Sequence, residues 1–169
     1  MKLEVVGHGA LRAVQREELE LLELPHAQKL FAGDIFGALN TLVSASEEHV
    51  RGFALLVDDT PRGFFLLKRG RLLPPWADDD AATLHALMVD VEWQGRGLGK
   101  HCLQGLPELV QAVWPQVRQL MLSVDPENQP AIQLYSKLGW VDSGTAYRGR
   151  SAYERRMVLA LGSIDANAL

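Results

Sequence analysis

The stretch Gln94-Gly95-Arg96-Gly97-Leu98-Gly99-Lys100 lies between an apolar run, 82–91, and a segment with the spacing of an amphipathic helix. Glycines let the chain turn tightly and let backbone N–H groups approach an anion, and the start of a helix adds unpaired donors and the positive end of its dipole. The stretch therefore predicts a phosphate-binding loop. The glycines alone leave one alternative open, a strand-to-helix turn that binds no ligand.

The spacing of these glycines decides which kind of phosphate loop is expected. A P-loop needs glycine in place of Gln94 and serine or threonine in place of His101, so it is excluded. The dinucleotide-binding pattern G-x-G-x-x-G also fails, because the glycines here are spaced G-x-G-x-G. The pattern Q/R-x-x-G-x-G/A does fit, on Gln94, Gly97 and Gly99.

Hydrophobic periodicity and turn residues predict the elements on either side of the loop. Before it we expect a helix running into a short strand over 12–24, two short helices over 26–48, a hairpin of strands 51–57 and 62–68, and a strand over 82–91. After it we expect a helix from Leu98 to Val113 kinked or split at Gly105 and Pro107, a strand over 120–124, a helix capped by Asn128 or Gln129 and ended by Gly139, and strands over 140–145 and 153–159. The order predicts an α/β domain with a mixed sheet.

Composition and charge exclude several classes of protein. Of the 169 residues 47% are apolar and 22% charged, which excludes a mainly disordered chain. The net charge of −4 argues against nucleic acid as the main partner, and the longest apolar runs are too short to cross a bilayer. The N-terminus has no signal-peptide pattern, so a cytoplasmic protein is expected. The single cysteine, Cys102, and the absence of zinc-like spacing predict no metal and a buried, apolar role for that thiol.

A second block of residues follows the strand expected at 120–124. It consists of Asn128, Ala131, Leu134-Tyr135 and Leu138-Gly139-Trp140. With the glycine loop upstream of it, the chain resembles the GNAT superfamily, the Gcn5-related N-acetyltransferases, from about Arg51 to Leu159. The resemblance implies one domain over 1–169: acceptor-side helices in 1–50, a sheet and acetyl-CoA-binding core in 51–159, and a tail in 160–169. It also implies a mixed, mostly antiparallel sheet splayed between its fourth and fifth strands.

The resemblance implies roles for particular residues. Tyr135 would protonate the departing CoA thiolate, although its helical spacing also fits a core aromatic. A backbone N–H near Val89 would polarise the thioester carbonyl. Asn128 would contact the cofactor arm or an ordered water, or serve as a helix cap. The residues implied in holding acetyl-CoA are Leu87, Met88, Val89, Val91, Gln94, Gly95, Arg96, Gly97, Leu98, Gly99, Lys100, Asn128, Ala131 and Tyr135.

The general base is left open by the sequence. Asp90, Glu92 and His85 are candidates. In a regular strand His85 would lie on the face opposite Asp90 and Glu92, and a bulge would change that. A water chain could also replace a dedicated base.

The expected function is direct acetyl transfer from acetyl-CoA to a primary amine of a small molecule or peptide, with no metal, nucleic acid or membrane involved. A non-catalytic acyl-CoA sensor or partner-binding module of the same fold is the alternative, and the resemblance leaves a homodimer open.

Overall fold

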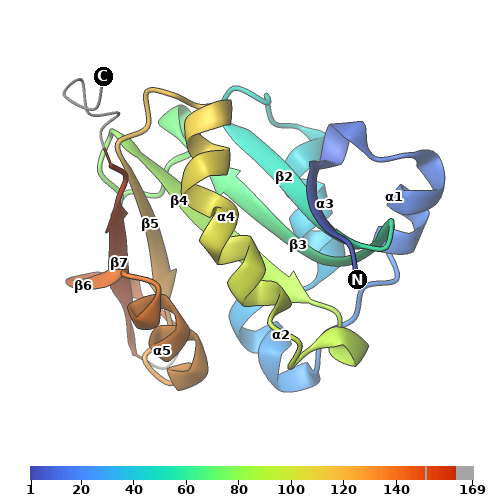
Figure 1. Cartoon of the computed structure of the whole chain (residues 1–169). Helices are drawn as coiled ribbons and strands as arrows, with labels where there is room; N and C mark the ends of the chain where they lie inside the picture. Colours follow the sequence, from blue (N-terminus) through green and yellow to red (C-terminus); the bar gives the residue numbers. More distant parts are fainter. Residues whose placement is uncertain (151, 163–169) are drawn as a thin grey trace. The chain divides into compact units, whose positions relative to one another are not determined.

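The computed structural model describes residues 1–150 and 152–162 (Figure 1). Its strands are β1 (Leu3–Gly7), β2 (Val50–Val57), β3 (Thr60–Lys68), β4 (Ala81–Val89), β5 (Gln119–Val124), β6 (Val141–Arg148) and β7 (Tyr153–Ala160). Its helices are α1 (Ala13–Leu19), α2 (His26–Ala32), α3 (Ile35–Val43), α4 (Leu98–Val113) and α5 (Gln129–Lys137), with 3₁₀ turns η1 (His8–Ala10), η2 (Gly70–Leu72) and η3 (Val91–Trp93).

The seven strands follow the order β1-β2-β3-β4-β5-β7-β6, which confirms the mixed sheet. The β1–β2, β2–β3, β5–β7 and β6–β7 pairs are antiparallel. The β4–β5 pair is parallel and joins Ala81–Thr83 to Gln119–Met121. The α/β domain with a mixed sheet expected from the element order is therefore present, and the sheet is mostly antiparallel, as the resemblance implies.

The chain forms two compact units. The first unit comprises Met1–Lys68 and Leu84–Leu103, and the second comprises Arg69–Thr83 and the chain from Gln104 onward. In the first unit, alternate residues of β2 and β3 share a face because side chains alternate across a strand. Ala54 and Phe64 from these strands are fully buried in a cluster with Leu19 of α1 and Ile35 of α3. Helices α1 and α3 are thus held on the sheet by apolar burial.

Local sequence explains the turns in the first unit. The β2–β3 hairpin turns at Asp58 and Asp59, whose φ values are 46° and 70°, and aspartate tolerates this left-handed region better than most residues. Helix α2 ends at Gly33, where φ is 75°. Helix α3 begins after Asp34, whose carboxylate accepts the N–H of Gly37 at 2.8 Å. These turns confirm the predicted hairpin and the predicted pair of short helices.

Several predicted boundaries are wrong. Strand β1 was not expected, because its five residues lack a clear alternation and gain their hydrogen bonds only from β2. The short strand expected at 22–24 is absent, and the segment forms part of the connection between α1 and α2. Helix α4 continues through Pro107 and is not split. Of the expected tail, residues 163–169 lie outside the described residues.

Candidate functional site

Strand β4 contains a left-handed residue near its centre. Ala86 has a φ of 54°, which is unusual for a residue with a Cβ. Such a residue interrupts the regular alternation of a strand, as a β-bulge does, and backbone strain of this kind concentrates at functional sites. The alternation expected from His85 to Asp90 held only for a regular strand, and Ala86, which lies between them, makes this strand irregular. Alanine gives no sequence signal for this conformation.

The end of β4 is fixed by Asp90. Its carboxylate accepts the backbone N–H of Glu23 at 2.9 Å and that of Glu92 at 3.2 Å. The N–H of Val91 in turn donates to the carbonyl of Glu23 at 2.7 Å. Val91 was expected on the strand edge, but it lies in η3, because Asp90 caps that turn. Asp90 is thus engaged in shaping the backbone just before the glycine loop.

The glycine loop has the backbone geometry that its composition predicts. Gly95 and Gly97 have φ values of 76° and 78°, and a Cβ added to either would meet nothing within 4 Å. The first helical hydrogen bond of α4 runs from the His101 N–H to the Gly97 carbonyl at 3.0 Å, so the N–H groups of residues 98–100 precede the helical ladder. Open space beside unpaired donors at a helix N-terminus suits a diphosphate. The loop geometry therefore suits a phosphate or another small anion.

Gln94 connects the loop to the acceptor-side helices. Its side-chain N–H donates to the Val89 carbonyl at 2.9 Å and to Gln28 Oε1 at 2.8 Å, and Gln28 Nε2 donates back to Gln94 Oε1 at 3.1 Å. We call this reciprocal contact the Gln28–Gln94 amide pair. Gln28 lies in α2, far from the loop in sequence, so no local pattern identifies it. The pair ties α2 to the end of β4 and to the start of the glycine loop.

Two guanidinium groups lie near the ring of Trp93, one residue before Gln94. The Arg62 guanidinium carbon is 4.6 Å from the ring centroid and that of Arg96 is 4.4 Å from it. Cation–π contact of this kind stabilises a charge close to a ring. Arg62 Nε is buried and has no hydrogen-bond partner within residues 1–150 and 152–162. These positive charges beside the loop favour an anionic ligand.

In the second unit, Tyr135 is oriented by the end of α5. Gly139 has a φ of 96°, its N–H donates to the Ser136 carbonyl at 3.2 Å, and the N–H of Trp140 donates to the Tyr135 carbonyl at 3.0 Å. This is the Schellman pattern predicted by the glycine after the helix. It brings the Tyr135 and Trp140 rings to a centroid distance of 5.8 Å. At the other end of α5, Asn128 occupies the N-cap position, but its side chain makes no capping hydrogen bond.

Burial sets the protonation of three groups. It raises the pKa of Tyr135 to about 12, so the phenol keeps its proton at neutral pH. It raises the pKa of the Cys102 thiol to about 12, and the thiol is buried, as expected. Burial, with the nearby charge of Lys68, lowers the pKa of His85 to about 3, so that imidazole is neutral and a weak base.

The predicted site residues fall in both units. Those placed in the first unit are Leu87, Met88 and Val89 on β4, Val91 and Glu92 in η3, Gln94 to Gly97 in the loop, and Leu98, Gly99 and Lys100 in the first turn of α4. Those placed in the second unit are Asn128, Ala131 and Tyr135, at the N-cap of α5 and within it. Gln28, Arg62 and Ala86 were not among the predicted site residues.

Two kinds of feature are absent from the part of the chain that the structure describes. Residues 1–150 and 152–162 contain no cluster of three or more histidine, cysteine, aspartate or glutamate residues able to hold a metal ion. Among the same residues no helix combines the length and apolarity needed to cross a membrane.

Comparison with known proteins assigns the family. The profile of the acetyltransferase (GNAT) family matches residues 8–140, and the chain belongs to this family. Over 92 residues it is 32% identical to an uncharacterized N-acetyltransferase, YbbJ, of Bacillus subtilis (strain 168), covering 53% of this chain and 58% of that protein. Over 128 residues it is 34% identical to the mycothiol acetyltransferase of Thermobifida fusca (strain YX), covering 60% and 39%. The chain thus spans about half the length of these curated relatives.

Solved structures with the same fold extend this comparison. Aminoglycoside acetyltransferase AAC(6')-Ib in complex with coenzyme A matches with a TM-score of 0.71 and 18% identity, over 94% of this chain and 95% of the other. Spermidine N-acetyltransferase from Vibrio cholerae, in complex with CoA and spermine, matches with a TM-score of 0.68 and 17% identity, over 94% and 95%. At these identities the likeness defines the fold.

Proposed function

We propose that this protein is an acetyl-CoA-dependent N-acetyltransferase that moves an acetyl group directly to a primary amine of a small molecule or peptide. The observation that carries the proposal is the glycine loop, where two left-handed glycines and open space precede the N-terminus of α4. Neighbours of the same fold hold coenzyme A or acetyl-CoA with amine substrates. The proposal treats the chain as one functional domain in the cytoplasm.

Backbone groups do most of the binding in this proposal. The N–H groups from Gln94 to Lys100 hold the diphosphate, and the Leu87–Val89 edge of β4 with Val91 holds the pantetheine arm. Acetyl-CoA supplies an activated acetyl group as a thioester. A backbone N–H near Val89 polarises its carbonyl, as an oxyanion hole does. Positioning both reactants then provides much of the rate acceleration.

We assign the general acid to Tyr135. Its phenol, with a pKa of about 12, is protonated throughout the neutral range, and in this proposal it donates that proton to the thiolate as the thiolate leaves. The Schellman end of α5 and the Trp140 ring limit its mobility. Asn128 and Ala131 are assigned to the cofactor arm, and the missing cap bond of Asn128 leaves its amide available for that contact.

For the base, the structure favours Glu92 over Asp90. The Asp90 carboxylate already accepts two backbone N–H groups, whereas Glu92 is exposed on η3. Neutral His85, with a pKa of about 3, is too weak a base to compete at neutral pH. A water chain to solvent is the remaining route for the amine proton.

The test is calorimetric titration with acetyl-CoA and with CoA, followed by thiol release against a panel of small amines, amino acids and peptides. Tight binding with amine-dependent thiol release supports the proposal and identifies the acceptor class. Binding with no release on any acceptor favours a non-catalytic sensor, and absence of binding refutes the assignment.

A further inference from the structure

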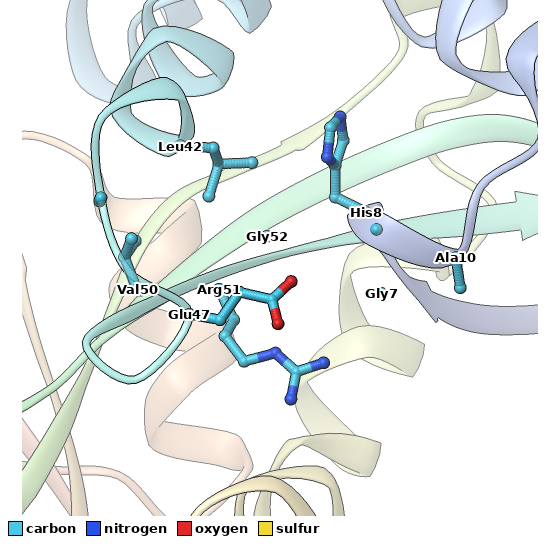
Figure 2. Close-up of a pocket in the computed structure, with 10 residues that line it drawn as sticks. Gly7, His8, Ala10, Leu42, Glu47, Val50, Arg51 and Gly52 are labelled. Atoms are coloured by element: carbon cyan, nitrogen blue, oxygen red, sulfur yellow. The ribbon is translucent and has the colours of Figure 1, made fainter.

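A pocket of ≈ 430 Å³ lies in the first unit, away from the glycine loop (Figure 2). It is formed by the end of β1, the turn η1, the α3–β2 connection and the start of β2. Figure 2 shows His8, Glu47 and Arg51 among its lining side chains, with Leu42 on one side. Its volume lies within the usual range for small-molecule sites, roughly 300–1,000 Å³.

The pocket carries one acidic and one basic side chain that do not neutralise each other. Within residues 1–150 and 152–162, Glu47 and Arg51 make no ion pair and no side-chain hydrogen bond, either together or with another residue. The Arg51 guanidinium carbon lies 5.5 Å from the centroid of the Phe53 ring, which restrains it. A ligand that presents both charges could pair with both groups.

Glycines shape the space around these two charges. A Cβ on Gly7 would lie 3.5 Å from Arg51 Nη2, and a Cβ on Gly9 would lie 3.4 Å from Glu47 Oε1. A Cβ on Gly52 would lie 2.7 Å from Leu42 Cδ1, so glycine at this position lets Leu42 pack over the strand. The charged groups therefore lie beside backbone that carries no side chains, next to an apolar wall.

His8 adds polarity to the pocket without a third charge. Its ring lies edge-on to Phe64, with 6.5 Å between centroids. Burial, and then the charge of Arg16, lowers the pKa of His8. A neutral imidazole offers one donor and one acceptor to a ligand.

The pocket is distinct from the glycine loop. It lies at the Val50 end of β2, and Val50 pairs with Lys68 of β3. The end of β4 that leads to the glycine loop meets β3 at Arg62, whose carbonyl accepts the Asp90 N–H at 2.8 Å. Lys68 and Arg62 are six residues apart in the chain, which is about 20 Å along a strand. A small ligand in the pocket would not reach the loop donors.

We propose that this pocket is a binding site for a free α-amino acid with an apolar side chain. Arg51 binds the carboxylate, because a guanidinium matches the geometry of a carboxylate, and Glu47 binds the ammonium group. Leu42 and its neighbours Ala45 and Val50 contact the side chain. The site goes beyond the proposed acetyl transfer and does not depend on it.

The test is calorimetry on the full chain without acetyl-CoA, using each free L-amino acid and two truncated forms of leucine. Isopentylamine lacks the carboxylate and 4-methylpentanoate lacks the ammonium group. We expect saturable binding of apolar amino acids such as leucine, at least tenfold weaker binding of both truncated ligands, and no dependence on CoA binding. Comparable affinity for leucine and for either truncated ligand overturns the proposal without any variant, as does the absence of saturable amino-acid binding.

Two variants test which charged group of the ligand each of the two side chains binds. Arg51→Gln is expected to remove the preference for leucine over isopentylamine, and Glu47→Gln the preference for leucine over 4-methylpentanoate. Glu17→Gln and Arg71→Gln change the same residue types at exposed positions outside the pocket and should bind leucine as the parent does. Unchanged leucine binding in both pocket variants would place the ligand elsewhere and refute the assignment.

Discussion

Breaking the Gln28–Gln94 amide pair should weaken acetyl-CoA binding, although Gln28 lies in α2, outside the glycine loop. Gln28→Ala removes the two hydrogen bonds of 2.8 and 3.1 Å, and leaves Gln94 its bond to the Val89 carbonyl. The pair is exposed, so the net free energy of each hydrogen bond lies near the low end of the usual range, at about 0.5 kcal/mol. Together the two bonds then contribute about 1 kcal/mol to ordering the loop.

A loss of about 1 kcal/mol corresponds to a roughly fivefold higher Kd for acetyl-CoA, because the loop must then be ordered at the expense of binding free energy. Gln94→Ala also frees the Val89 carbonyl and should raise the Kd further, to about tenfold or more. In the double variant the effects should not add, since either single change already breaks the pair. Calorimetry on all four proteins gives the coupling free energy.

Gln104→Ala is the matched control, because Gln104 is exposed on α4 and makes no side-chain hydrogen bond within the described residues. It should bind acetyl-CoA as the parent does. Strict additivity of the Gln28 and Gln94 effects, or a Gln28 effect no larger than that of Gln104, would refute the view that α2 orders the loop.

Three further changes test the fold and the site. Gly97→Ala places a Cβ on a residue with a φ of 78°, and should lower the free energy of unfolding by about 1 kcal/mol and weaken acetyl-CoA binding. Gly105 lies in α4 with open space around it, so Gly105→Ala should raise the free energy of unfolding by about 1 kcal/mol, measured by thermal unfolding. Tyr135→Phe should lower kcat about a hundredfold with little change in the Kd for acetyl-CoA, and an unchanged kcat would remove it from the mechanism. The pKa of the His85 imidazole is lowered from 6.5 in the unfolded chain to about 3 in the folded protein. The free energy of unfolding should therefore be highest above pH 6.5 and fall as the pH falls toward 3, by about 2 kcal/mol between pH 8 and pH 5 in denaturant titrations. The His85→Gln variant should show a flatter dependence of stability on pH.

The elements with strong local signals were predicted correctly. The Asp58–Asp59 turn, the break at Gly33 and the glycine after α5 each depend on residues that tolerate positive φ, so local sequence suffices to place them. The spacing of Gln94, Gly97 and Gly99 is likewise local, and with the block around Tyr135 it identified the family that the comparisons then established.

Other features depend on contacts between distant segments. Strand β1 is a strand only because β2 provides hydrogen bonds along its edge, and the pattern of its five residues does not show this. Pro107 fits within α4, although local propensity predicts a break. The left-handed conformation of Ala86 has no marker in the sequence, because alanine rarely adopts it without tertiary constraint.

By itself the sequence determined the order of the helices and strands from α2 onward, the position of the glycine loop and the family, because glycine spacing and hydrophobic periodicity are properties of neighbouring residues. Only the tertiary structure decided that Gln28 meets Gln94, that Asp90 is engaged by the backbone of Glu23, and that Glu47 and Arg51 line a pocket with Gly7. These contacts join residues from separate segments, and their geometry is set by strand register and helix packing, which local propensity does not encode.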